Sequence, residues 1–177
     1  MKSRLLKLCV LGALVAALCL AGAIPRPAPK LEFTSMDGQQ VSLAALKGKV
    51  VLVMYFSTDC PHCQTAAQTL APIYKELKPK GFEILGLAMN PTAKQNLGAF
   101  RDNYQAYFPM TTATRAEFSA FSGLSVMDRF YYPYFLFVDR EGNVRMEAHG
   151  GDRAFFGDLS RNVLDVTTKL LEGKPTS

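Results

Sequence analysis

The sequence predicts one α/β domain, with a central mixed β-sheet flanked by helices and an N-terminal β-hairpin extension. Two largely apolar runs, residues 50–56 and 82–88, are rich in β-branched and aromatic residues, which is typical of buried strands. Each run is followed by apolar residues three and four positions apart, at 60–78 and 93–108, the spacing of one helix face. A chain of 177 residues has room for one such domain with a substantial core.

The elements before and after the first buried strand can be assigned in chain order. Asp37-Gly38 suits a tight turn, so residues 33–41 are predicted to form the hairpin, and residues 42–46 to add a helical turn. The helix at 60–78 contains Pro72, which is expected to kink it. Its apolar stripe consists of Ala66, Leu70, Ile73, Tyr74 and Leu77, and that of the helix at 93–108 of Leu97, Phe100, Tyr104 and Tyr107.

The later elements complete the sheet and cover it. Residues 110–112 are predicted as a short strand and 117–121 as a short helix, and residues 134–138 and 144–149 as a hairpin. Asp152 can N-cap a last helix that ends at Gly173-Lys174-Pro175.

The N-terminus has the pattern of a signal peptide. Residues 1–7 are basic, 8–20 are apolar, and Ala21-Gly22-Ala23 is a small-x-small cleavage signal. The alternative is an uncleaved membrane anchor formed by residues 8–24. In both cases we expect an exported, periplasmic or extracytoplasmic domain. Residues 24–30 are predicted as a proline-rich linker, 31–173 as the domain and 174–177 as a tail.

Charge excludes one class of partner. The formal net charge is +5, but three of the cations lie in the leader, so the rest of the chain is nearly neutral and has no basic run. Nucleic-acid binding is therefore not expected. A monomer is the expected state.

The cysteine count indicates redox chemistry. Cys9 and Cys19 lie in the leader, so the exported chain keeps only Cys60 and Cys63. A disulfide this short restricts the unfolded chain little, which makes an inert structural bridge the weaker alternative and a redox-active dithiol the stronger one.

The Cys60-Pro61-His62-Cys63 motif, placed between a buried strand and a helix, resembles the thioredoxin superfamily. Residues 38–52 and 132–142 are similar to the exported TlpA/ResA-like branch, and the similarity covers about residues 31–172. The resemblance implies a thioredoxin-like fold and thiol-disulfide exchange. The Pro-His pair inside the motif is similar to the oxidase DsbA.

The chemistry of exchange assigns separate roles to the two cysteines of the motif, and Pro61 and His62 between them are expected to tune the redox couple. Cys60, at the helix N-terminus, is expected to attack as a thiolate stabilised by unpaired N–H groups. Cys63, one turn further and more buried, is expected to resolve the mixed disulfide. His62 can stabilise the thiolate of Cys60, or be a plain solvated side chain, whereas the neighbouring carboxylate of Asp59 opposes that charge.

The resemblance also implies a substrate groove. Pro133 is expected to be cis and to face the dithiol, so that the backbone of Tyr132 can pair with an extended substrate segment. Phe130 and Tyr131 either line an apolar rim there or simply pack. Two acidic residues of the family are missing, because Met54 and Ala66 stand at their positions. Glu83 on the neighbouring strand is the candidate replacement as a base for Cys63.

Two other functions compete with thiol-disulfide exchange. A peroxiredoxin-like peroxidase needs Pro and Thr where this chain has Val53 and Ser57, which disfavours it. A copper chaperone of SCO type would use Cys60, Cys63 and His149. The preferred function is a protein disulfide reductase rather than an oxidase, without a metal and with no cofactor beyond the Cys60-Cys63 disulfide. Its expected partners are cysteine-containing exported proteins and a membrane or periplasmic thiol electron donor or acceptor.

Overall fold

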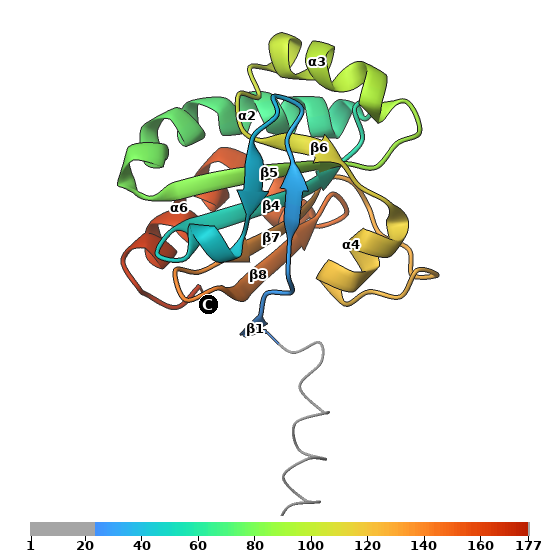
Figure 1. Cartoon of the computed structure of the whole chain (residues 1–177). Helices are drawn as coiled ribbons and strands as arrows, with labels where there is room; N and C mark the ends of the chain where they lie inside the picture. Colours follow the sequence, from blue (N-terminus) through green and yellow to red (C-terminus); the bar gives the residue numbers. More distant parts are fainter. Residues whose placement is uncertain (1–23, 177) are drawn as a thin grey trace, which may run out of the picture.

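The computed structural model describes residues 24–176, which form a six-stranded mixed sheet covered on both faces (Figure 1). The strand order is β1-β8-β7-β4-β5-β6. These strands are β1 (Arg26–Pro27), β4 (Val50–Phe56), β5 (Phe82–Ala88), β6 (Met110–Thr112), β7 (Tyr134–Val138) and β8 (Asn143–His149). A separate antiparallel hairpin consists of β2 (Glu32–Thr34) and β3 (Gln40–Ser42).

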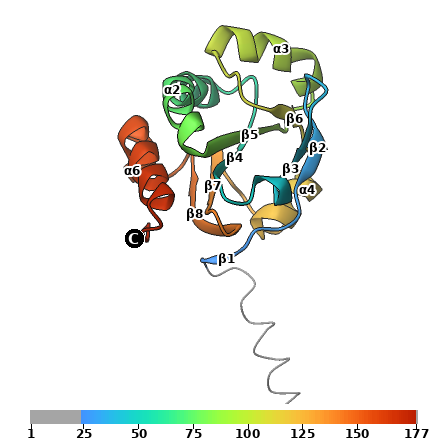
Figure 2. The same ribbon diagram turned by 60° about the vertical axis from the view of Figure 1, so that its left-hand side comes forward.

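The helices form the two outer layers. They are α2 (Pro61–Leu77), α3 (Ala93–Tyr104), α4 (Arg115–Ser122), α5 (Arg153–Phe156) and α6 (Leu159–Leu171), with short 3-10 helices at Ala44–Leu46 and Lys78–Lys80. Figure 2 shows α2 and α6 on one side of the sheet and the β2-β3 hairpin with α4 on the other. All seven residues of β4 are buried because the strand lies between these two layers.

The alternation of side chains along β4 divides the core in two. Leu52, Met54 and Phe56 belong to the apolar cluster that contains Cys63 and the inner faces of α2, α3 and α6. Val53 and Tyr55 belong to the opposite cluster, under α4 and the hairpin. The strand is parallel to β5 and antiparallel to β7, so the sheet is mixed as the sequence predicts.

Most predicted elements are confirmed, and two of the helices differ. Helix α3 ends at Tyr104, because Gln105 takes the left-handed conformation (φ 55°), and Tyr107 is 63% exposed instead of packing in the stripe. The single last helix is in fact two, α5 and α6, each with its own aspartate cap, Asp152 and Asp158. Helix α2 continues through Pro72 to Leu77.

The segment predicted as a linker contributes to the sheet. Arg26 and Pro27 pair with Val144 and Asn143 of β8. The Arg26 guanidinium is buried, lies 2.7 Å from Glu147 Oε1 and donates to the carbonyl oxygen of Ser122 at 2.9 Å. A spacer would not bury an arginine, so residues 24–30 are not the free linker that their proline content suggested.

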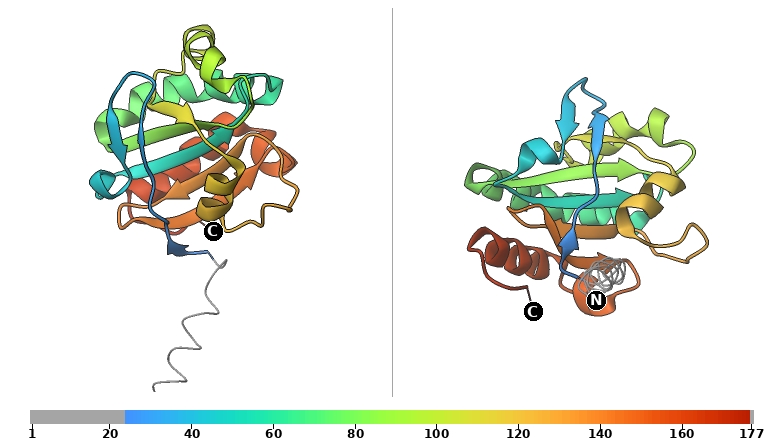
Figure 3. Two further views of the ribbon diagram at one scale, coloured as in Figure 1. Left: turned by 45° about the vertical axis from the view of Figure 1, so that its right-hand side comes forward. Right: turned by 60° about the horizontal axis from the view of Figure 1, so that its bottom comes forward.

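Both views of Figure 3 show β1 at the edge of the sheet, next to β8. The predicted signal peptide lies outside the described residues, as does all but Ile24 of the alternative anchor. Within residues 24–176, no helix has the length and apolar character needed to cross a bilayer.

Candidate active site

The Cys60-Pro61-His62-Cys63 motif begins α2 directly after the loop that follows β4. Cys60 is the N-cap, with extended backbone angles (φ −86°, ψ 117°), and Pro61 is the first helical residue. Proline suits that position because its N–H would have no helical partner and its φ is already helical, and it disfavours helical angles in the residue before it. The carbonyl oxygen of Cys60 accepts the first helical hydrogen bond, from Gln64 N–H at 3.0 Å.

The two cysteines are thiols in very different surroundings. Cys60 is half-buried, whereas Cys63 has no exposed surface. Burial raises the pKa of the Cys63 thiol; the Ser57 N–H lowers it to a lesser extent, and the hydrogen bond with Cys60 raises it further. The protein therefore holds Cys63 as a protonated thiol beside an accessible Cys60, the division of roles that sequential attack and resolution require.

Pro61 and His62 lie on the exposed side of this first turn. His62 faces an open cleft whose other walls include Tyr131, Arg153 and Phe156. Among the hydrogen bonds of residues 24–176, none joins His62 to Cys60. The effect of His62 on the Cys60 thiolate stays a prediction.

Asp59 is held by a polar network that links the loops after β4 and β5. Its Oδ2 accepts from Asn90 Nδ2 at 2.9 Å and from Thr92 Oγ1 at 3.2 Å. Asn90 also accepts from the backbone N–H of Thr58 at 2.9 Å and donates to its hydroxyl oxygen at 2.8 Å. This network fixes the residue before Cys60. The only signal of it in the sequence is the position of Asn90, two residues after the strand at 82–88.

The Tyr132-Pro133 peptide bond is cis, as the resemblance implies. Tyr132 is half-buried and packs on the core cluster that contains Cys63. Burial raises the pKa of Tyr132, and the nearby Cys63 and Cys60 raise it further. The structure thus brings the chain before Pro133 to the two cysteines, although they are about 70 residues apart in the sequence.

Gly150 supports the loop that contains the cis Tyr132-Pro133 peptide, a role that was not predicted from the sequence. Its N–H donates to the carbonyl oxygen of Tyr131 at 3.2 Å, and a Cβ added to it would lie 2.0 Å from the carbonyl oxygen of Tyr132. Only glycine allows the two backbones to approach so closely. The feature of the sequence that could have indicated this close approach is the Gly150-Gly151 pair directly after the last strand.

Glu83 is not the base for Cys63. It is paired with Val51 near the start of β4, whereas Cys60 follows the other end of that strand. Its carboxylate is buried and accepts a hydrogen bond from the hydroxyl group of Tyr74. Tyr74 of α2 supplies the partner that allows this carboxylate to be buried.

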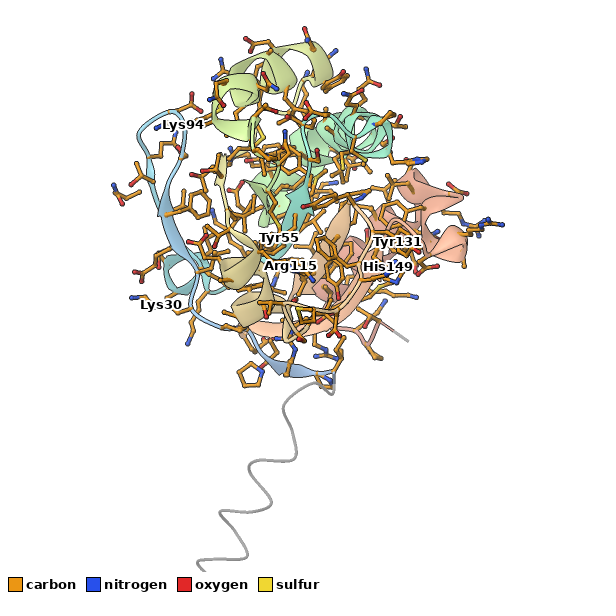
Figure 4. All side chains as sticks on the ribbon, turned by 90° about the vertical axis from the view of Figure 1, so that its right-hand side faces the viewer. Lys30, Tyr55, Lys94, Arg115, Tyr131 and His149 are labelled. Carbon is orange, nitrogen blue, oxygen red and sulfur yellow. The ribbon has the colours of Figure 1, made fainter. Side chains whose placement is uncertain are left out.

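The ligand set of the copper alternative is not assembled. His149 Nδ1 accepts the N–H of Gly151 at 3.1 Å. The His149 ring stacks on that of Tyr131, with centroids 5.9 Å apart (Figure 4). It also stacks on the ring of Tyr134, at 6.2 Å. In the part of the chain that the structure describes, no three His, Cys, Asp or Glu side chains are grouped to hold a metal ion.

Solved structures identify the architecture as the thioredoxin fold. A thiol:disulfide interchange protein of the thioredoxin family from Chlorobium tepidum TLS superposes with a TM-score of 0.70 at 28% identity, covering 84% of this chain and 98% of that one. A hypothetical protein from Sinorhizobium meliloti 1021 has the same fold at 17% identity, with a TM-score of 0.71 over 88% of this chain and 87% of that one.

Sequence relatives include two kinds of protein. The thiol-disulfide oxidoreductase ResA of Bacillus thuringiensis is 27% identical over 129 residues, 72% of this chain and 70% of that protein. A probable glutathione peroxidase 8-A of Xenopus laevis is 31% identical over 86 residues, 45% of this chain and only 41% of that protein. Residues 24–147 match the family model described as AhpC/TSA, and the chain therefore belongs to the AhpC/TSA family.

Proposed function

We propose that the chain is an exported thiol-disulfide oxidoreductase that reduces disulfides of cysteine-containing exported proteins through Cys60 and Cys63. The observation that carries the proposal is the pairing of a half-exposed Cys60 at the N-cap of α2 with a fully buried, protonated Cys63 one turn later. The cis Tyr132-Pro133 peptide beside them offers backbone groups to an extended substrate.

The reaction consists of two exchanges. The Cys60 thiolate attacks one sulfur of the substrate disulfide, so a Cys60–substrate bond forms, the substrate S–S bond breaks, and the released sulfur takes a proton from water. Cys63 then loses its proton to water and attacks the Cys60 sulfur, which releases the second substrate thiol. Two electrons pass to the substrate, and the Cys60–Cys63 disulfide must be reduced again by a membrane or periplasmic thiol donor.

Reduction is favoured over oxidation by the surroundings of Cys60. The carboxylate of Asp59, in the adjacent residue, disfavours a thiolate on Cys60 and so destabilises the dithiol form relative to the disulfide. His62, which would act in the opposite direction, has no hydrogen bond to Cys60 in the described part of the chain. Export is inferred from the signal-peptide pattern of residues 1–23.

A peroxidase is the second candidate, because the AhpC/TSA family and the glutathione peroxidase relatives favour it. The chain has Val53 and Ser57 at the two positions where a peroxiredoxin needs Pro and Thr, and Val53 is buried within β4. Consumption of hydrogen peroxide at a rate matching that of protein disulfides would make peroxide the substrate.

The cysteine variants test the proposal directly. We expect Cys60→Ser to abolish turnover, and Cys63→Ser to accumulate mixed disulfides with protein substrates through Cys60, seen as adducts on non-reducing gels that disappear with reductant. The double variant is the control for Cys9 and Cys19 and should form no adducts. Full multiple-turnover activity of Cys63→Ser would refute the two-cysteine mechanism.

A further inference from the structure

The loop of residues 124–131, between α4 and β7, carries exposed apolar side chains and leads directly into the cis-proline peptide of the candidate active site. Val126 is 53% exposed, Met127 86% and Tyr131 60%. The other exposed large apolar side chains in residues 24–176 lie on separate elements and are Ile24 (42%), Met36 (37%) and Tyr107 (63%). An apolar cluster in one loop, continuous with the cis-proline peptide, is a feature typical of an interaction site.

The tip of this loop is ordered by its own hydrogen bonds. The backbone N–H of Ser125 donates to the carboxylate of Asp128 at 2.7 Å, and the N–H of Asp128 returns a bond to the carbonyl oxygen of Ser125 at 3.0 Å. The N–H of Met127 donates to Ser125 Oγ at 3.2 Å. The turn is therefore built from polar groups, yet it displays Val126 and Met127 to solvent, where loop tips are usually polar.

Arg115 fastens this turn to α4. Its guanidinium donates to the carbonyl oxygens of Val126 at 3.2 Å, of Ser125 at 3.3 Å and of Asp128. It also lies 4.3 Å from the ring centroid of Phe130, which in turn stacks on Phe118. The planar guanidinium of arginine can donate to three carbonyl oxygens and lie over an aromatic ring at the same time, which the compact ammonium group of lysine cannot do.

Phe130 connects this clamp to the active site. Its ring packs edge-to-face on that of Tyr132, with centroids 5.0 Å apart, and Tyr132 begins the cis peptide. The exposed tip, the Arg115 clamp and the cis-proline peptide are thus one contiguous structure. Figure 4 shows Arg115 and Tyr131 on the same face of the molecule.

We propose that residues 124–131 form a docking lip for the apolar side chains that flank the cysteine in extended segments of substrate proteins. Arg115 is a positioning residue that orders the lip before the substrate arrives. The inference rests on the proposed function and adds to it the substrate class, namely exposed apolar segments as found in unfolded or partly folded proteins. An extended segment paired with the backbone of Tyr132 would run beside the lip, and the flexible thioether of Met127 can adapt to different apolar side chains.

The test uses two peptide disulfides of equal length and charge, with either leucines or serines two and three residues on each side of the cysteine. With the full-length chain, we expect kcat/KM to be about tenfold higher for the leucine peptide, because one apolar side chain is buried on the lip. Met127→Ser should reduce this preference to about twofold and Met127→Leu should retain it. Met36→Ser, the same change on the distant hairpin, is the matched control and should keep the full preference.

Arg115→Gln and Arg115→Lys test the clamp. Both variants should raise KM for the leucine peptide and so lower the preference for it, since the loop must then be ordered on binding. A general loss of folding would instead lower kcat for both peptides alike. Equal rates for the two peptides with the wild-type chain would overturn the lip but not the proposed function; no reduction of either peptide would refute the proposed function itself. Equal rates together with weaker binding of Met127→Ser to phosphatidylcholine vesicles would assign the loop to a membrane and also overturn the proposal.

Discussion

Burial distinguishes two chemically identical side chains, Cys60 and Cys63. The pKa of Cys63 is raised chiefly because its thiolate would lie in an apolar core, and in the described residues 24–176 no acidic side chain is among the groups that shift this pKa. In the proposed mechanism, resolution must therefore use the small fraction of Cys63 that ionises.

This predicts a pH dependence for the resolving step. Below the raised pKa, the thiolate fraction of Cys63 grows about tenfold with each pH unit, so resolution should accelerate by about that factor per unit from pH 6 to 9. Rapid mixing with a chromogenic aromatic disulfide reports Cys60 attack as a first release of dye and Cys63 attack as a second. Cys63→Ser should lack the second phase, and a second phase independent of pH in the wild type would show that another group removes the proton.

Asp59 provides a second prediction at the scale of one residue. Asp59→Asn removes the negative charge next to Cys60, which should stabilise the thiolate and make the couple more oxidising by about 30 mV, the equivalent of roughly 1.4 kcal/mol. The potential is measured against thiol redox buffers. Asp165→Asn, which changes an exposed aspartate on α6, should leave it unchanged. An unaltered potential in Asp59→Asn would mean that the donors around the carboxylate already cancel its effect.

At the scale of elements, β8 and the turn after it hold the cis-proline loop in place. The expected consequence of Gly150→Ala is a displaced Tyr132 backbone, because the new Cβ would overlap its carbonyl oxygen, and a loss of about a hundredfold in kcat/KM with protein disulfides. Gly98→Ala is the control, since its Cβ in α3 would meet nothing closer than 3.9 Å. Wild-type activity in Gly150→Ala would show that the loop position is not critical.

The β1 strand gives a prediction for stability. Arg26→Ala leaves the partly buried carboxylate of Glu147, whose side chain is 18% exposed, without its cation and should lower the free energy of unfolding by about 3 kcal/mol. Lys30→Ala breaks only the exposed pair with Glu32 and should change it little. Denaturant unfolding of both variants measures the difference. If Arg26→Ala were as stable as Lys30→Ala, residues 24–30 would contribute no stability to the domain and would act as a spacer.

For the whole molecule, the sequence was sufficient to predict the fold and the position of the two cysteines at the start of α2, but not the surroundings of the site. The apolar runs of β4 and β5 and the motif after β4 depend on local patterns, which can be read from one sequence. The partner of Arg26 is 121 positions away and that of Gly150 belongs to a loop before β7, so only the folded chain reveals them. The prediction of Glu83 as a base for Cys63 failed for the same reason, because its burial depends on Tyr74, a partner that only the folded chain reveals.

The same reasoning applies to the docking lip. Its exposed side chains are ordinary apolar residues in the sequence. The clamp that orders them depends on Arg115, which lies just before the helix predicted at 117–121 and carries no sequence signal of this role. Function at this scale combines local cysteine chemistry with loops that are brought together by the sheet.

The reduction potential of the Cys60–Cys63 couple tests the central claim most directly. The chain is equilibrated in thiol redox buffers, alkylated and digested with trypsin, and the peptide of residues 50–75, which contains both cysteines and neither Cys9 nor Cys19, is read by mass. A reductase predicts a value near the roughly −270 mV of thioredoxin. A value near the roughly −120 mV of DsbA would contradict the account and make the protein a disulfide donor in which His62 outweighs Asp59.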